Sequence, residues 1–390
     1  MEKLIYLDNA ATAWPKPEKV YEFAHSFYRK TGVNPGRSGF DLAIEAGNII
    51  EDLRKRLTAF FGGEVDVPER LCYAYNATDA LNLIIQGLVV EGDHVITTNL
   101  EHNSVIRPVN TLVRDAGVEA TYVPFNDKGF VEPGFIEDAI RPNTKLVIVN
   151  HGSNVLGTVQ PLKEIGRVCK DHGVLFATDS AQTAGVIPIN MEEMNLDVLT
   201  FTGHKSLMGF TGIGGMFVRK HVEIRQTRSG GTGVRSAYPF HLEEYPFRLE
   251  YGTPNMLGIA SLWAGQDFIE SMGGVEKIHA QEMKLAVRLV EGLRELDNVI
   301  IYGCEDMDNH LSTVTINVEG MEASDVGIML DVEFDIATRT GLHCAPLVHE
   351  QIGTMPIHGG VRFSIGAFNT AEDIEAAIRA MAEIGTRVRK

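Results

Sequence analysis

The sequence predicts an α/β fold built on a mainly parallel sheet, followed by a smaller α+β domain. Short runs rich in Val and Ile alternate with amphipathic stretches, as in βαβ units that cover a parallel sheet with helices. After about residue 255, long helical stretches replace this alternation. The chain has 390 residues, and single hydrophobic cores stop growing at roughly 250–300 residues. We therefore expect two domains.

The first part of the chain contains seven expected strands, each a short apolar run. In order they are Leu71–Tyr75, His94–Thr98, Ala120–Pro124, Lys145–Asn150, Val174–Thr178, Val198–Thr202 and Gly215–Val218. Helical periodicity predicts helices between them, with Gly or an acidic residue at most of their ends. These helices are Thr78–Val90, Asn103–Ala116, Pro133–Ile140 and Leu162–Asp171.

The second part begins with a long helical stretch over Gly258–Leu296. It continues with strands at Val299–Ile301 and Thr313–Val318, and with helices that begin at Ala323 and Ala371. The two parts are joined by "TRSGGTGVRSAYPFHLEEYPFRLEYGTPN", which is rich in Gly, Pro and aromatic residues. This segment is too long for an ordinary turn, and loops of this kind often carry function.

Composition and charge exclude several classes of partner. The 35 basic and 52 acidic residues give a formal net charge of −17, which repels phosphate backbones and anionic lipids. No apolar run approaches the roughly 20 residues of a membrane span, and Glu2 and Asp8 do not fit a signal peptide. We expect a cytoplasmic protein with no nucleic-acid or membrane partner.

Four cysteines are spread along the chain without a CxxC pair. This spacing predicts neither a disulfide framework nor a zinc site, so we expect free thiols and no bound metal. Packing in the core is the ordinary role of a free cysteine. Cys72 in "LCYAY" and Cys169 in "GRVCKDHG" fit that role.

Polar or ionisable side chains follow five of the predicted strands. They are Thr78 and Asp79, His102, Asn154, Asp179 and Gln182, and His204 with Lys205. Ligands of open α/β sheets bind beyond the carboxyl ends of the strands, so these side chains are candidates for one site. Each alone has a plain structural explanation, since Thr78 and Asp179 could cap helices and Lys205 could be a surface lysine.

Together these side chains supply the parts of a pyridoxal 5'-phosphate (PLP) site. A helix N-terminus suits the phosphate, an imidazole suits the ring, a lysine forms the Schiff base, and a carboxylate keeps the pyridine nitrogen protonated. A dinucleotide site is not supported, because the glycines near Gly209–Gly215 lack GxGxxG spacing after a strand. No GxxxxGK[ST] loop occurs either. We expect Gly203 and these glycines to let the backbone pass close to the cofactor.

Six motifs in order along the chain resemble the class V aminotransferase group of fold-type I PLP enzymes: "YLDNAAT", "EHNSVIRP", "SNVLGT", "TDSAQ", "TGHK" and "GTPN". Further on, "RTGLHCAPLVHEQIG" and "VRFSIGAFNTAEDI" resemble the group II cysteine desulfurases, which include selenocysteine lyases. The resemblance covers nearly the whole chain. It implies an N-terminal arm (1–16) that packs with the small domain, a large domain (17–257) with a mainly parallel seven-stranded sheet, and a small α+β domain (258–390).

The resemblance also implies the residues that hold the cofactor. Lys205 would form the Schiff base with PLP, Asp179 would pair with the pyridine nitrogen, and His102 would stack on the ring and assist proton movement. The other implied contacts, to the ring oxygen and the phosphate, are Thr78, Asp79, Asn154, Gln182, Thr202 and His204.

Residues outside the large sheet complete the implied site. In the family, Thr253 of "GTPN" reaches the phosphate of the neighbouring subunit, so a homodimer with shared active sites is implied. Arg362 would bind the substrate carboxylate, a planar bidentate task that suits a guanidinium. Arg339 and Asn154 would lie beside the same substrate pocket.

Cys344 stands in "RTGLHC", a loop that contains a glycine. Without context, a lone cysteine is more often a packing residue than a nucleophile. Here Arg339 and His343 are close in sequence, and nearby cations favour the reactive thiolate. Since the resembling family accepts the substrate's sulfur at this position, Cys344 is the expected nucleophile.

The resemblance therefore implies a PLP-dependent cysteine desulfurase. The freed amine of Lys205 would remove the α-proton of L-cysteine, and Cys344 would take the sulfur as a persulfide and leave L-alanine. A sulfur-acceptor protein would then serve Fe–S cluster assembly or another sulfur-transfer pathway. Three alternatives stay open: a selenocysteine lyase acting on L-selenocysteine, a transaminase or β-lyase in which Cys344 is incidental, and a non-catalytic subunit of a sulfur-transfer assembly.

Overall fold

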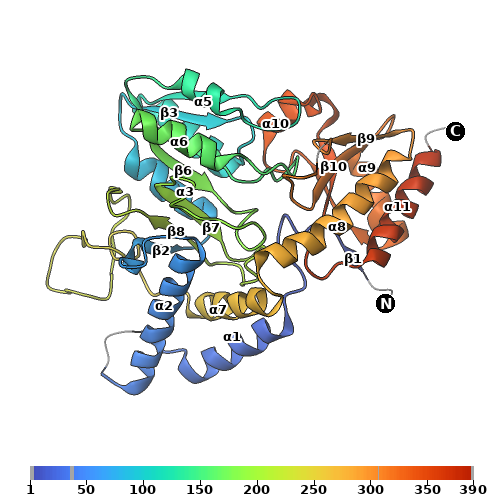
Figure 1. Ribbon diagram of the computed structural model, residues 1–390. Helices are drawn as coiled ribbons and strands as arrows, with labels where there is room; N and C mark the ends of the chain where they lie inside the picture. Colours follow the sequence, from blue (N-terminus) through green and yellow to red (C-terminus); the bar gives the residue numbers. More distant parts are fainter. Residues whose placement is uncertain (1–3, 36–38, 306, 388–390) are drawn as a thin grey trace.

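The structure of the protein is a computed structural model that describes residues 4–35, 39–305 and 307–387. Figure 1 shows a large body with a central sheet and a smaller body beside which both ends of the chain lie. Within the described ranges, no helix has the length and apolar character needed to cross a membrane.

A seven-stranded sheet forms the centre of the large body. Its strands are β2 (Leu71–Ala74), β3 (His94–Thr98), β4 (Glu119–Val123), β5 (Thr144–Asn150), β6 (Leu175–Asp179), β7 (Val198–Thr202) and β8 (Gly214–Val218), in the order β2-β8-β7-β6-β5-β3-β4. In this sheet only β8 runs antiparallel to its neighbours, so the other six strands point their carboxyl ends to one edge. The predicted mainly parallel seven-stranded sheet is confirmed.

Helices cover both faces of this sheet (Figure 1). They are α1 (Glu18–Thr31), α2 (Asp41–Phe60), α3 (Ala77–Leu88), α4 (Asn103–Ala116), α5 (Pro133–Ala139), α6 (Leu162–His172) and α7 (Met256–Ser271), with a 3-10 turn η1 (Pro68–Arg70). Successive residues of β5 enter different cores: Ile148 belongs to the core that contains residues of α3 and α4, and Val149 to the core that contains residues of α2, α6 and α7. A parallel strand buried on both faces needs such a continuous apolar run.

The small body contains a four-stranded antiparallel sheet, in the order β12-β13-β10-β9. Its elements are α8 (Val275–Arg294), β9 (Val299–Tyr302), β10 (Thr313–Val318), α9 (Ala323–Phe334), β12 (Arg339–Gly341), α10 (Pro346–Gln351), η2 (Met355–Ile357), β13 (Gly360–Ser364) and α11 (Ala371–Thr386). Strands and helices of this part share a separate core around Val314, Phe363 and Ile374.

The helical stretch expected over Gly258–Leu296 is divided into α7 and α8. Gly273 and Gly274 separate the two helices with φ values of 90° and 95°, a conformation that favours glycine and ends a helix. Although α7 lies almost wholly beyond residue 257, its residue Leu262 belongs to the core of the large sheet. The packing of the chain therefore changes from the large to the small core after α7.

The N-terminal arm runs along both bodies. Its strand β1 (Ile5–Tyr6) pairs in parallel with β11 (Ile336–Ala337), and Leu7 enters the small core. Further along, the Ala13 N–H donates to the His204 carbonyl of the large body at 3.2 Å. The arm thus connects the two bodies near the end of β7; its first three residues lie outside the described ranges.

Candidate active site

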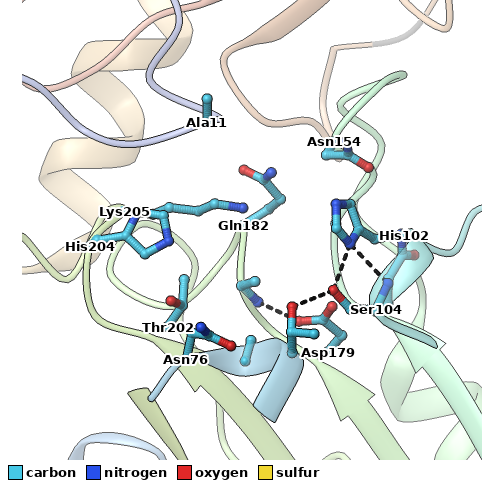
Figure 2. Close-up of a pocket in the computed structure, with 15 residues that line it drawn as sticks. Ala11, Asn76, His102, Ser104, Asn154, Asp179, Gln182, Thr202, His204 and Lys205 are labelled. Atoms are coloured by element: carbon cyan, nitrogen blue, oxygen red, sulfur yellow. Dashed lines mark hydrogen bonds between the residues drawn. The ribbon is translucent and has the colours of Figure 1, made fainter. Parts of the chain in front are cut away.

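A cavity of about 240 Å³ lies at the carboxyl edge of the large sheet. Figure 2 shows Lys205 and His102 facing it from opposite sides, with Gln182 between them. Most of the predicted PLP residues line it: Thr78, His102, Asn154, Asp179, Gln182, Thr202, His204 and Lys205. Parallel strands whose ends meet at one edge explain why residues more than 100 positions apart converge here.

Lys205 follows β7 in a compact turn. The Met208 N–H donates to the Lys205 carbonyl at 2.8 Å, and the Gly209 N–H donates to the Gly203 carbonyl at 2.8 Å. Burial lowers the pKa of Lys205 to about 8, an effect that the charge of Asp179 partly offsets. Within the described residues no hydrogen-bond or ion-pair partner of its ammonium is found, so the side chain is free to react.

The glycines near Lys205 have a packing role that differs from the expected one. A Cβ atom on Gly203 would lie 2.9 Å from Leu262 Cδ2, and one on Gly209 would lie 2.8 Å from the same atom. Larger residues would therefore push the Lys205 loop away from α7. These two glycines bring the loop against a helix and not against the cavity.

Asp179 ends β6 and is buried. Its Oδ1 accepts from the Ala181 N–H at 2.9 Å, and burial raises the pKa of this carboxyl. A cation such as a protonated pyridine nitrogen would oppose that rise by favouring the carboxylate.

His102 is the N-cap of α4. Its Nδ1 accepts from the Ser104 N–H at 3.1 Å and lies 2.7 Å from Ser104 Oγ, so the proton of the neutral ring is on Nε2. Burial, and then the charge of Lys205, lower the pKa of His102 to about 4. Ser104, which the sequence analysis does not single out, also lies 2.7 Å from Thr78 Oγ1 and links the ring to the phosphate side (Figure 2).

The phosphate side of the cavity lies at the start of α3. Asn76 caps this helix by accepting from the Asp79 N–H at 2.9 Å, while the first N–H groups of a helix have no partner within it. His204 Nδ1 lies 3.0 Å from Thr12 Oγ1 of the arm. Asp79 differs from expectation, because its carboxylate turns away from the cavity to Arg228 and accepts from the Tyr75 N–H at 3.2 Å.

Three observations fit this cavity to PLP. Thr202 Oγ1 and Asn154 Oδ1 are buried without a hydrogen-bond partner among the described residues, and such atoms are rare unless a ligand or water completes them. Lys205 is half-buried and has no acidic contact among the described residues, as a Schiff-base lysine requires. The helix start at α3 is suited to an anion.

The small body contributes two arginines. Arg362 of β13 is 2% exposed; its NH2 group donates to Asp8 Oδ1 at 2.6 Å and its NH1 group to the Asn154 carbonyl at 3.1 Å. Its Nε has no hydrogen-bond partner in the part of the chain that the structure describes. Arg339 of β12 places its NH2 group 3.9 Å from Cys344 Sγ. Both arginines thus lie at the junction of the two bodies.

The Cys344 loop lies against the large body. The Asn103 N–H donates to the Cys344 carbonyl at 2.7 Å, and Asn154 Nδ2 donates to the His343 carbonyl at 2.7 Å. Cys344 is partly exposed, whereas the other three cysteines are buried. Burial raises the pKa of Cys169 and Cys304 to about 12, so those thiols are unreactive at neutral pH.

His343 does not supply the cation expected beside Cys344. Burial lowers the pKa of His343 well below its usual range. Its Nε2 lies 3.2 Å from the Arg339 carbonyl and its Nδ1 lies 3.2 Å from His349 Nε2. The neutral ring therefore belongs to a hydrogen-bonded chain, and Arg339 is the cation that stands beside the thiol.

Thr253 lies just before α7 and is exposed. It does not line the cavity of its own chain. Its implied contact with a neighbouring subunit therefore remains a prediction.

The fold, with a half-buried lysine and a buried carboxylate at one sheet edge, defines a PLP-dependent enzyme of fold-type I. The model of the family described as "Aminotransferase class-V" matches residues 5–377. The chain therefore belongs to the class-V aminotransferase family, and its cofactor is PLP.

Relatives match along nearly the whole chain. A probable cysteine desulfurase of Methanothermobacter thermautotrophicus is 32% identical, over 97% of this chain and 94% of its own length. One of Pyrococcus abyssi is 34% identical, over 98% and 94%. The apo structure of the cysteine desulfurase from Thermococcus onnurineus NA1 is 34% identical, with a TM-score of 0.92 over 98% of this chain and 95% of that chain.

Proposed function

We propose that the chain is a cysteine desulfurase, which converts L-cysteine to L-alanine and leaves a persulfide on Cys344. The observation that carries this proposal is the pair of hydrogen bonds that hold the Cys344 loop against the large body. Asn103 is the neighbour of His102, and Asn154 lines the cavity. A partly exposed thiol beside a PLP site serves sulfur transfer, whereas transamination has no need of it.

Lys205, Asp179 and His102 perform the acid–base and electrostatic work. Bound PLP supplies an electron sink for the electrons released at the substrate Cα. The Lys205 amine removes the α-proton of the substrate. Asp179 would pair with the pyridine nitrogen of the bound cofactor, and neutral His102, with its proton on Nε2, would contact the ring.

The remaining cofactor contacts divide into two groups. Thr78, Thr202 and His204 bind the phosphate together with the free N–H groups at the start of α3. Gln182 and Asn154 contact the ring oxygen. We leave the Asp79 side chain out of this set because its carboxylate pairs with Arg228.

Arg362 binds the substrate carboxylate, and Arg339 stands beside the attacking sulfur of Cys344. The thiolate attacks the substrate sulfur, so an S–S bond forms while the Cβ–S bond breaks. The electron pair of the broken bond stays with the substrate Cβ, which is protonated, and return of a proton to Cα gives alanine. The enzyme keeps one sulfur atom as a persulfide, and an acceptor protein later removes it.

We further propose that the protein acts in the cytoplasm as a homodimer in which Thr253 of each subunit contacts the phosphate in the other. The exposed position of Thr253, outside its own cavity, supports this. L-selenocysteine is the alternative substrate, because the same residues would serve it.

The decisive experiment compares Cys344→Ala with Cys169→Ala in purified, PLP-loaded protein. With L-cysteine and a reductant, we expect Cys169→Ala to produce alanine and sulfide at the wild-type rate and Cys344→Ala to lose at least about 100-fold. Full activity of Cys344→Ala would exclude the persulfide step. Repeating the assay with L-selenocysteine separates the two substrates, since a variant that fails only on cysteine identifies a thiol-dependent desulfurase.

Cofactor attachment is tested separately from sulfur transfer. Wild type should be yellow, and Lys205→Ala should lose the absorbance of the bound Schiff base. A colourless wild type that does not take up added PLP would contradict every enzymatic version of the proposal.

A further inference from the structure

His349, on α10, lies behind the Cys344 loop and has no part in the proposed reaction. It is fully buried, and its ring centroid lies 5.3 Å from that of His343. Its Nδ1 lies 2.7 Å from Thr354 Oγ1. A buried imidazole pair beside a nucleophile is either a packing element or a device that fixes the loop.

Thr354, His349, His343 and the Arg339 carbonyl form a chain of hydrogen bonds in which each donor and acceptor is determined. The Arg339 carbonyl only accepts, so His343 Nε2 carries the proton and His343 Nδ1 is an acceptor. His349 Nε2 must therefore donate to His343 Nδ1, which leaves His349 Nδ1 as an acceptor for the Thr354 hydroxyl. Burial lowers the pKa of His349 to about 4, so both rings are neutral and the chain has one consistent arrangement.

The loop held by this chain has an unfavourable backbone. His343 and Cys344 have φ values of 50° and 59°, in the left-handed region that is unfavourable for residues other than glycine. Such a conformation persists only where surrounding contacts enforce it. Hydrogen bonds from Asn103 and Asn154 hold the two carbonyls, while the His343 ring is held by His349 at Nδ1 and by the Arg339 carbonyl at Nε2.

The chain also fixes the distance between Arg339 and the thiol. His343 donates to the carbonyl of Arg339, whose guanidinium stands 3.9 Å from Cys344 Sγ. This hydrogen bond closes a loop from residue 339 to residue 343, so Arg339 and the adjoining Cys344 are held together.

We propose that His349 is a positioning residue that holds Cys344 and Arg339 together through a directed chain of hydrogen bonds from Thr354 to His349, to His343 and to the Arg339 carbonyl. This inference rests on the proposed role of Cys344. It assigns to a residue of α10 control over sulfur transfer and none over the cofactor chemistry at Lys205.

The test replaces His349 with Leu and with Gln. Leu fills the space but cannot donate to His343, whereas Gln keeps an N–H donor near the position of Nε2. We expect His349→Leu to slow alkylation of Cys344 by iodoacetamide about tenfold and His349→Gln to stay within about threefold of wild type, because only the Leu variant would release Cys344 from its position beside Arg339. Peptide mass spectrometry follows Cys344, with buried Cys169 as internal reference and His172→Leu, an exposed histidine of α6, as control.

A second readout uses L-cysteine with the PLP-loaded protein. In His349→Leu, exchange of the substrate α-proton with deuterated water should keep the wild-type rate, while alanine formation falls about tenfold or more. If packing were the only role, Leu would match or exceed Gln in both assays, and that result would overturn the proposal.

Thr354 provides a variant that does not depend on the folding of His349→Leu. Thr354→Val keeps the shape of the side chain and removes the donor to His349 Nδ1, so alkylation of Cys344 should slow about threefold, while Thr354→Ser restores it. Equal alkylation rates in Thr354→Val and Thr354→Ser would contradict the proposed chain of hydrogen bonds. Failure of Cys344→Ala to lose desulfurase activity would refute the proposed function and leave these alkylation results intact.

Discussion

The two halves of the site are built in different ways. On the large sheet, Asp179 ends β6, and His102 and Lys205 come a few residues after β3 and β7, so backbone ladders buried on both faces determine their positions. On the small body, Arg362 and Cys344 depend on contacts with distant segments, namely Asp8 of the arm and Asn103 of α4. The cofactor half, which contains His102, Asp179 and Lys205, is therefore a rigid edge of the sheet. The sulfur half, which contains Arg362 and Cys344, is an assembled half that depends on long-range contacts, and single substitutions can break these contacts.

Asp179→Asn tests whether the two halves can be separated. Asn keeps the acceptor for the Ala181 N–H but removes the charge, so kcat/KM for cysteine should fall about 10²–10³-fold. Alkylation of Cys344 should be unchanged, because no contact links the two residues directly. A parallel loss in both assays would show that the halves are not independent.

The pH dependence of cofactor uptake tests the rigid edge alone. Only the neutral amine of Lys205 reacts with the PLP aldehyde, and its pKa in the chain without cofactor is lowered to about 8. The rate of PLP uptake, followed by absorbance, should rise about tenfold per pH unit up to about pH 8 and then level off. A rate that keeps rising to pH 10 would indicate an ordinary exposed lysine.

Asp8→Asn tests the assembled half. The Asn side chain can still accept from Arg362 but leaves its buried charge without a counter-ion, which a substrate carboxylate would then supply. We expect KM for L-cysteine to fall about threefold to tenfold with little change in kcat. If KM rises instead, Asp8 helps to bind the substrate and does not compete with it.

Glu101 allows a stability test of the junction between β5 and the His102 turn. It is buried and accepts from Thr98 Oγ1 at 2.8 Å and from the Asn150 N–H at 2.9 Å. Burial raises the pKa of Glu101 to about 8. The folded state therefore binds more protons than the unfolded state between about pH 4.5 and pH 8, and the free energy of unfolding falls as the pH rises through this window.

Glu101→Gln cannot ionise and should lack that part of the pH dependence. At pH 8 we expect it to be more stable than wild type by about 2–4 kcal/mol, with little difference near pH 4.5. Unfolding midpoints at the two pH values measure this, and exposed Glu291→Gln serves as control. Parallel midpoint curves for wild type and Glu101→Gln would contradict a neutral Glu101.

The sequence predicts the rigid edge better than the assembled half, for a physical reason. Strand periodicity and the residue after each strand are local signals, so the sheet and the cavity wall of Lys205, Asp179 and His102 follow from short windows. The Asp8–Arg362 pair joins residues at opposite ends of the chain, and β13, which carries Arg362, is absent from the predicted strands. No local pattern reports such contacts.

The same distinction explains two smaller differences. The carboxylate of Asp79 turns to Arg228, a partner far along the chain that a motif cannot reveal. His349 has no neighbour in sequence that points to its role, because its partner His343 is identified only by the turn of the loop. Ser104 could have been found, since a polar residue two positions after an N-cap often completes the cap.

The arm has a thermodynamic consequence beyond tethering the two bodies. Within a few residues it contacts Arg362 through Asp8 and His204 through Thr12 and Lys16. A shift of this segment that changes phosphate binding also changes the charge offered to a substrate carboxylate. Linkage then requires the effect to be reciprocal: whatever factor cofactor occupancy applies to carboxylate affinity, a bound carboxylate applies to cofactor affinity.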